Sequence, residues 1–396
     1  MKKMITVMLT LALASIGYAE TIEKEFDIAG GNELTLDLET GGSVYISGWE
    51  KDKVGVKVHV SGIDSDAYYI DFDSGSSRIT INSDYKGGWF RKNKNSGYFE
   101  FDIKVPSEFD LQIETLGGDV RVADVKGKIN GETMGGDLEF LNIEGDIEFE
   151  TMGGGITALK INGILDLETM GGNITVTDSK ADGRVSTMGG WITIENVDGG
   201  LEGSTMGGEV SYYNVTGISG SGRAGDEVNI NSMGGAISID SAPMGATLET
   251  KGGEITVRSA GKFVDAETLG GDIRIYEIDG WVRAKTLGGN VTVNMVGDPN
   301  QGQRDVTISS LGGDIELTIP DGLSMDFDIE IAYTKDARRD YEIISDFEIK
   351  QKRSDRWENS RGSKRKFIYG TGQVGDGSNK IEISTINGDV LIKRGG

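Results

Sequence analysis

Residues 132–140 read Glu-Thr-Met-Gly-Gly-Asp-Leu-Glu-Phe, and the chain repeats this stretch at a fixed spacing. A Thr/Ser-x-Gly-Gly signature begins at Thr115, Thr133, Thr151, Thr169, Thr187 and Thr205, and again at Ser232, Thr250, Thr268, Thr286 and Ser310. From 115 to 205 and from 232 to 286, successive signatures start 18 residues apart. So short a period is typical of a solenoid, in which each repeat buries its apolar face against its neighbours.

Each repeat has the pattern of two short strands. After the glycine pair, Leu138 and Phe140 alternate with acidic residues, and Ile147 and Phe149 do so again after an expected bend at Asn142. Alternation with a period of two is typical of a strand with one buried face. The glycines suit tight turns, because a turn needs φ values that a Cβ disfavours.

These features predict an all-β fold, a single-stranded parallel β-helix with about 18 residues per rung and β caps at both ends. A helix would scatter the apolar residues around its axis and place Gly-Gly in its interior. The chirality preference of parallel crossovers predicts a right-handed coil. We expect a signal peptide at 1–19, an N-terminal β cap at 20–110, solenoid repeats at 111–320, and a C-terminal excursion with a closing rung at 321–396.

The N-terminus has the features of a secretory signal. Two lysines precede an apolar stretch, and Gly17-Tyr18-Ala19 supplies small residues for cleavage. We therefore expect export to the periplasm, the outer surface or the medium, and no transmembrane segment in the mature chain. The 396 residues include no cysteine, which excludes disulfides and thiolate metal sites. The net charge of −24 argues against a nucleic-acid partner.

Catalytic constellations are scarce in the sequence. His59 is the only histidine, so any Ser-His-Asp relay would have to use it. The period is interrupted near 218–226 and 297–303, and insertions on one edge of a solenoid often form its working face. A carbohydrate-processing enzyme with a carboxylate pair on this edge is therefore one hypothesis.

Exposed aromatic and basic residues form the candidate binding surface. Aromatic rings at strand or turn surfaces could stack on sugars, and two arginines lie in or beside the insertions. The candidates are Trp191, Tyr213, Tyr276, Trp281, Arg223 and Arg304. Isolated exposed aromatics are also ordinary on protein surfaces, and that alternative stays open.

Three further patterns have alternative interpretations. One glutamate precedes each of four consecutive signatures (Glu114, Glu132, Glu150 and Glu168). These glutamates form either a solvated ladder or the ligands of a calcium-stabilised structural rod. The Met residues before Gly-Gly form either a half-exposed corner or a groove for a ligand or a partner; they are Met134, Met152, Met170, Met188, Met206 and Met233. The basic run at 350–366 could contact the acidic repeats, a second copy, or anionic envelope polymers, or could be a solvated loop.

Together these motifs resemble a bacterial β-strand-repeat family known as putative adhesins, a domain of unknown function related to the head-GIN auto-transporter adhesins. The resemblance rests on the signal peptide, the Thr-x-Gly-Gly repeats, residues 101–106 and the closing stretch at 370–390. It implies an exported β-helical protein without known catalysis. Our leading hypothesis is therefore a non-enzymatic adhesin or envelope scaffold without a cofactor, which binds cell-envelope polysaccharide or a surface protein.

Overall fold

A computed structural model describes residues 19–28, 32–75, 78–86, 97–215, 227–335, 340–360 and 362–395. Within these ranges the regular elements are strands, apart from one short 3-10 turn, η1 (Ser65–Ala67). The expected all-β class is thus confirmed. By its internal contacts the chain divides into two units, residues 1–189 (unit 1) and 190–396 (unit 2). The expected signal peptide lies outside the described residues except for Ala19, and no described helix is long and apolar enough to span a membrane.

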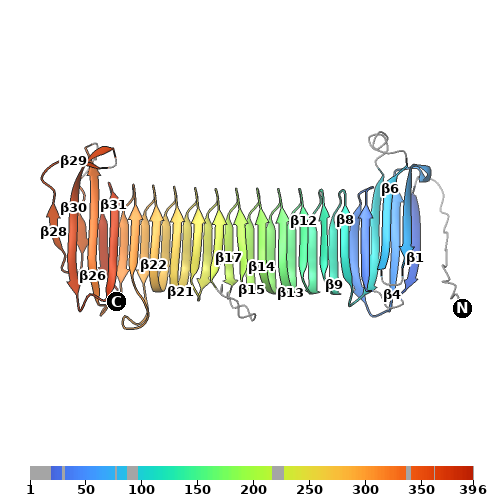
Figure 1. Ribbon diagram of the computed structural model, residues 1–396, viewed down its shortest axis with the longest axis horizontal. Helices are drawn as coiled ribbons and strands as arrows, with labels where there is room; N and C mark the ends of the chain where they lie inside the picture. The colour runs from blue at the N-terminus through green and yellow to red at the C-terminus, as the bar shows by residue number, and fades with distance from the viewer. Residues whose placement is uncertain are drawn as a thin grey trace. The chain divides into compact units, whose positions relative to one another are not determined.

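The repeats of unit 1 form two columns of parallel strands (Figure 1). The first column contains β8 (Asp110–Thr115), β10 (Ile129–Thr133), β12 (Ile147–Thr151) and the later part of β13 (Ile156–Thr169). The second contains β9 (Val120–Lys126), β11 (Leu138–Glu144), the earlier part of β13, and β14 (Ile174–Thr187). Thr133 pairs with Thr115 on one side and Thr151 on the other, so equivalent signature positions are aligned.

The core of unit 1 lies between these two columns. Leu138, Phe140, Ile147 and Phe149 are buried, and the rings of Phe140 and Phe149 pack with centroids 5.5 Å apart. Each such buried side chain contributes about 1.5–3 kcal/mol to stability. The bend expected at Asn142 is present, with φ at 55°.

The N-terminal strands of unit 1 combine antiparallel and parallel pairing. The antiparallel strands are β1 (Ala19–Asp27), β4 (Lys53–Ser61), β5 (Tyr68–Ser74), β6 (Arg78–Tyr85) and β7 (Tyr98–Pro106). The parallel strands β2 (Glu33–Leu38) and β3 (Ser43–Trp49) pair with β8 and β9. The ladder edges of β8 and β9 are therefore covered, which removes a template for edge-to-edge association.

Unit 2 repeats the two-column arrangement. One column holds β16 (Leu201–Thr205), β18 (Val228–Ser232), β20 (Ala246–Thr250), the later parts of β21 (Ile255–Thr268) and β22 (Ile273–Thr286), and β24 (Val306–Ser310). The other holds β15 (Ile192–Asp198), β17 (Val210–Val215), β19 (Ile237–Ala242), the earlier parts of β21 and β22, β23 (Val291–Met295) and β25 (Ile315–Ile319).

The C-terminal strands of unit 2 return to this stack. β31 (Asn379–Ile386) pairs in parallel with β24, and β32 (Val390–Arg394) pairs with β25. On their other side lie β26 (Met325–Thr334) and β27 (Ile343–Ser345). The antiparallel strands β28 (Lys350–Arg353) and β29 (Glu358–Ser360) pair with β30 (Ser363–Val374), which pairs with β26. The last strands in sequence therefore lie between the repeats and the excursion.

The second glycine of each signature is required mainly by close stacking. A Cβ on Gly271 would lie 1.9 Å from the carbonyl oxygen of Gly253 in the preceding rung, and one on Gly154 would lie 1.8 Å from that of Gly136. Neither Gly271 nor Gly154 has a positive φ in the range that side chains avoid. The expectation that a φ value unfavourable to side chains explains the Gly-Gly pair was thus incomplete. It holds at Gly136, where φ is 111°.

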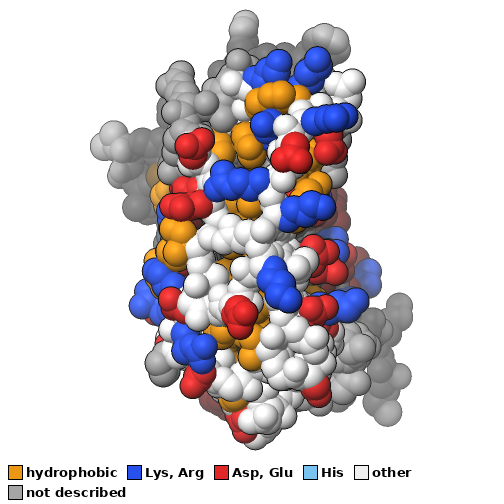
Figure 2. Space-filling view, turned by 90° about the vertical axis from the view of Figure 1, so that its left-hand side faces the viewer, with side chains coloured by type: hydrophobic (Ala, Val, Ile, Leu, Met, Phe, Trp, Pro, Cys, Tyr) orange, Lys and Arg blue, Asp and Glu red, His pale blue; other side chains and the backbone are white. Residues whose placement is uncertain are grey.

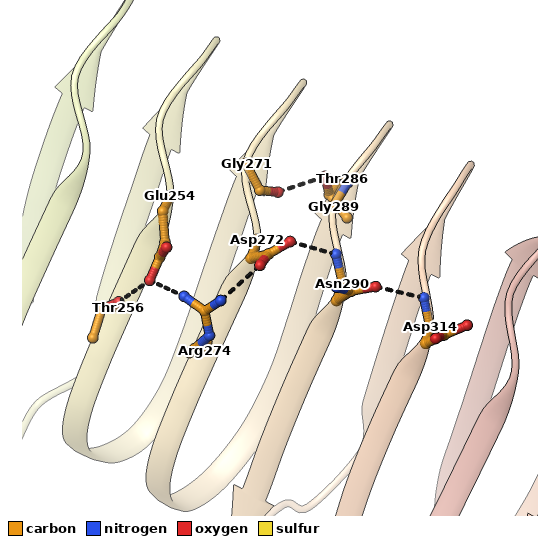
Figure 3. Close-up of polar contacts among 9 residues, drawn as sticks. All are labelled: Glu254, Thr256, Gly271, Asp272, Arg274, Thr286, Gly289, Asn290 and Asp314. Carbon is orange, nitrogen blue, oxygen red and sulfur yellow. Dashed lines mark hydrogen bonds and ion pairs between the residues drawn. The ribbon is translucent and has the colours of Figure 1, made fainter.

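A ladder of side chains accompanies this corner (Figure 3). The backbone N–H of Asn290 donates to Oδ1 of Asp272 at 2.7 Å, and that of Asp314 donates to Oδ1 of Asn290 at 2.8 Å. Arg274 links the ladder sideways by donating to Oδ2 of Asp272 at 2.7 Å and to Glu254. The bonds from the backbone of Asn290 and Asp314 satisfy turn amides that would otherwise depend on water.

Candidate functional site

Tyr213 and Tyr276, two of the predicted sugar-stacking residues, line the same hollow of unit 2. Tyr213 follows Tyr212 on β17, and Tyr276 follows Ile275 on β22. Tyr212 and Ile275 belong to one row of paired residues that runs through β19 and β21. Three steps between neighbouring strands, each about 4.8 Å, separate the two tyrosines by about 14 Å. Their side chains are 43% and 54% exposed, so both rings are accessible.

Asp240 on β19 and Arg258 on β21 occupy the two intermediate positions of this row. Arg258 Nε lies 3.1 Å from Oδ1 of Asp240, and both side chains are exposed to solvent. We name Tyr213, Asp240, Arg258 and Tyr276 the tyrosine surface. The hollow over it has a volume of about 860 Å³. The rest of its lining consists of Ile239, Glu277 and small hydroxyl residues (Ser238, Ser241, Thr256 and Ser259).

The arrangement combines two flat apolar platforms with hydrogen-bonding groups between them. An aromatic ring offers an apolar face, and Asp, Arg, Ser and Thr supply acceptors and donors for hydroxyl groups. Because a mutual ion pair leaves the remaining lone pairs and N–H groups of Asp240 and Arg258 free for other bonds, the pair can also bind a ligand. This combination suits a long polyhydroxylated chain.

The two tryptophans predicted to stack on sugars lie outside the tyrosine surface. Trp191 stands at the position that Asp272 and Asn290 hold in the corner ladder, and its side chain is 57% exposed. Trp281 is half-buried and stacks on Phe263, with ring centroids 4.9 Å apart and an angle of 11° between the planes. Neither lines the hollow between Tyr213 and Tyr276.

Arg304 was predicted as part of a binding surface, and the structure corrects this. Its side chain is 1% exposed. The guanidinium donates from Nε to the carbonyl of Gln301 at 3.0 Å, from Nη1 to that of Val296 at 2.8 Å, and from Nη2 to Asp279. A buried arginine needs such partners, so Arg304 serves to fix the 297–303 insertion. Arg223 lies outside the described residues.

A family model of the Toastrack DUF4097 domain matches residues 31–393, almost the whole chain. The chain belongs to the Toastrack DUF4097 family. The family resemblance seen in the sequence is thereby confirmed.

Three similar solved structures are named putative adhesins or a putative cell adhesion protein, and a fourth, from Parabacteroides distasonis, is named a putative lipid binding protein. A putative cell adhesion protein from Clostridium sporogenes is 11% identical, with a TM-score of 0.20, over 95% of this chain and 100% of that one. A putative adhesin from Bacteroides fragilis is 14% identical, with a TM-score of 0.36, over 60% and 97%. One from Parabacteroides merdae is 16% identical, with a TM-score of 0.29, over 71% and 97%. No curated protein matches the chain.

Acidic residues in and beside the 297–303 insertion accept hydrogen bonds that stabilise its turns. Oδ1 of Asp305 accepts from the backbone N–H of Lys380 at 2.7 Å, and Oδ2 of Asp298 accepts from Gln301 at 2.7 Å. Hydrogen bonds from the backbone of Asn300 and from the side chain of Gln301 lower the pKa of Asp298. Bonds from Ser324 and Ser378 likewise lower the pKa of Asp376, which together with Asp305 lines a separate hollow beside this insertion. A general acid needs a raised pKa, so these two carboxyls are poorly suited to that role.

In unit 1 the Glu and Met columns run side by side. Their side chains line a groove of about 450 Å³. We call this the Met–Glu groove and define it by Glu132, Glu150, Glu168, Met134, Met152, Met170 and Met188. Among the described residues no group of three or more His, Cys, Asp or Glu is placed to hold a metal ion.

The basic stretch of the Toastrack chain is partly organised as strands. Lys350 to Arg353 form the exposed strand β28, and Lys335 and Lys366 each place Nζ 5.6 Å from the ring centroid of Trp357. Arg361 lies outside the described residues. Figure 2 shows that Lys and Arg side chains alternate with Asp and Glu on this side of the molecule, so the visible face is mixed in charge.

Asp240 and Arg258 were not predicted as site residues. Arg258 lies one 18-residue period before Tyr276, and Asp240 lies two periods before it. Counting the column backwards from Tyr276 would have placed them between the tyrosines. The 27-residue step before Ser232 hides the last member, Tyr213, from a strict 18-residue count.

Proposed function

We propose that this Toastrack protein is an exported, non-enzymatic binding module, an adhesin or envelope scaffold whose tyrosine surface holds a neutral polysaccharide. The observation that carries the proposal is the placement of Tyr213 and Tyr276 in one row, on either side of the Asp240–Arg258 pair. Two platforms about 14 Å apart favour an extended chain of sugar rings over a single sugar.

The charge of the protein favours a neutral polymer. The chain carries a net charge of −24, so its field repels polyanions. Within the hollow, the charge of Arg258 is offset by Asp240 and by the neighbouring Glu277. A neutral polysaccharide avoids the repulsion and still offers hydroxyl groups to every polar residue of the lining.

The proposal includes the finer architecture and the destination. Export depends on residues 1–19 as a cleaved signal, with 20–110 and 321–396 as capping regions around the repeats at 111–320. The coil is right-handed, following the chirality preference of parallel crossovers. Each regular rung has 18 residues, which the 18-residue offset between paired strands supports.

The test measures binding of the purified mature protein to a panel of neutral and acidic polysaccharides, by affinity electrophoresis and by calorimetry. We expect a neutral polymer to bind, and Y213A/Y276A to weaken binding at least tenfold. Y98A is the matched control, because Tyr98 of unit 1 is 54% exposed and lies outside the tyrosine surface.

Failure of every neutral polymer to bind would overturn the proposal, as would an equal loss in Y98A. Release of reducing ends from a bound polymer would instead favour the carbohydrate-processing enzyme. A thermal midpoint that rises with calcium and falls with chelator would favour the calcium-stabilised rod.

A further inference from the structure

The Met–Glu groove contains a ladder of thioethers held in register by the backbone. The N–H of Met152 donates to the carbonyl of Thr133 at 3.2 Å, and that of Met170 donates to Thr151 at 3.2 Å. The same bond recurs at Met134 and at Met188. The four side chains therefore emerge from one corner on consecutive rungs, and they are 37–57% exposed.

A ladder of carboxylates runs beside the thioethers. Glu132 pairs with Glu150 across the strands, and Glu150 pairs with Glu168. No Lys or Arg of the described chain lies within ion-pair distance of these three carboxylates. Unpaired carboxylates on adjacent strands repel each other, so a bound cation would relieve that repulsion.

Unit 2 provides an internal contrast at the equivalent positions. Glu249 is paired with Lys251, which occupies the methionine column, and Glu267 is paired with Lys285. The next positions of that column are Leu269 and Leu287. From residue 249 to residue 287 the carboxylates are thus neutralised by the protein itself and the apolar residues of the column carry no sulfur, whereas Met206 and Met233 continue the methionine column earlier in unit 2.

The chemistry of the groove matches a soft monovalent cation. A thioether is neutral and soft, and it favours Cu(I) over hard cations such as calcium or magnesium. Equivalent positions on adjacent strands lie about 4.8 Å apart. Two metal–sulfur bonds of about the zinc–thiolate length, roughly 2.3 Å each, would span nearly that distance. Methionine has three rotatable side-chain bonds, so small rotations can bring neighbouring sulfurs onto one ion.

We propose that the Met–Glu groove binds Cu(I) or Ag(I) between the thioethers of consecutive rungs, with the glutamates supplying the compensating charge. The ion stays monovalent throughout, so binding involves no electron transfer. The four stacked methionines offer three neighbouring pairs, and Met152 and Met170 are the central pair. The inference is independent of the tyrosine surface, which lies in unit 2.

The first experiment uses the full mature chain with methyl-labelled methionine, titrated anaerobically with Ag(I) and followed by NMR. We expect the methyl signals of Met152 and Met170 to shift first. Met244, in the turn after β19, and the buried Met295 should not move at low ion ratios. Uniform shifts of all methionines, or no shift in the groove, would overturn the proposal.

The second experiment measures Cu(I) affinity by competition with bicinchoninate. M152L/M170L keeps the apolar volume and removes two sulfurs, and we expect affinity at least tenfold lower. The matched control M244L/M295L should bind as the parent does. Parent-like binding by M152L/M170L would contradict the thioether site.

The third variant tests the role of the carboxylates. E132Q/E150Q/E168Q should still bind Cu(I), because it retains the sulfurs. Its binding should be severalfold weaker and less dependent on salt, because the carboxylate charges are removed. If this variant lost all binding while M152L/M170L kept it, the site would be a carboxylate site and the proposal would fail. Polysaccharide binding should be unchanged in all these variants, which separates the two proposals.

Discussion

The hydroxyl of Thr268 donates to the carbonyl oxygen of Gly253, 2.9 Å away in the preceding rung. The same hydroxyl oxygen accepts from the N–H of Gly271 at 3.2 Å. The contact recurs at Thr250, Thr286 and, in unit 1, Thr169. The first residue of the signature is therefore a buried polar link between rungs, which explains why Thr or Ser begins each repeat.

We expect T268V to lower the free energy of unfolding by about 1–3 kcal/mol, because valine keeps the shape of the side chain and leaves buried polar groups of Gly253 and Gly271 without their partner. T268S keeps the hydroxyl and is the control. The measurement is urea unfolding followed by circular dichroism, and equal midpoints for T268V and T268S would contradict the role of the hydroxyl.

The two glycines of one signature should differ in their tolerance of a methyl group. G271A places a Cβ 1.9 Å from the carbonyl oxygen of Gly253, so the rungs must separate, at a cost of about 3 kcal/mol. G270A places its Cβ 3.4 Å from the nearest atom, an ordinary contact, and should change stability little. Thermal melting of the two variants compares them directly, and similar melting temperatures would disprove the stacking argument.

Removal of Arg304 should loosen the insertion and leave the rungs intact. In R304M the carbonyls of Val296 and Gln301 lose their donor, which costs about 1–3 kcal/mol locally. We expect faster hydrogen exchange at the amides of residues 297–303. R258M, which removes an arginine from the surface, should leave their exchange unchanged. Unchanged hydrogen exchange in R304M would contradict the role of Arg304 in holding the insertion.

The Glu254–Arg274 contact should make stability depend on acid pH. The hydrogen bond from Arg274 lowers the pKa of Glu254 below its usual value of 4.5. The unfolded chain therefore binds the proton more readily, so the contribution of Glu254 is present above pH 4.5 and is lost as the pH falls through the lower folded pKa. E254Q should show a shallower decline of stability below pH 4.5, measured by urea unfolding at several pH values. An identical decline would contradict the assignment.

Several features of the fold could be predicted from particular residues. The alternation at Leu138 and Phe140 predicted which side chains are buried, and Asn142 predicted the bend, because both depend on local pattern and local backbone preference. The second glycine was predicted for the wrong main reason. The 1.9 Å approach at Gly271 arises from the rung below, which a single repeat does not reveal.

The candidate site was predictable only in part. Tyr213 and Tyr276 could be selected as exposed aromatics, but their shared hollow depends on the register of four strands. Arg304 looked like a surface cation, because an arginine beside a loop is usually solvated. Its burial follows from the carbonyls of Gln301 and Val296, whose direction is a property of the folded insertion.

By itself the sequence determined the repeat, the strand pattern and the Thr-x-Gly-Gly corner, since each is encoded within about one period of chain. The tertiary structure alone decided which residues of different rungs meet. It placed an ion pair between two tyrosines, lined one groove with three glutamates and enclosed Arg304. The physical reason is that strand register aligns residues far apart in the chain to within about 5 Å, and pairing across that distance depends on the stacked neighbours.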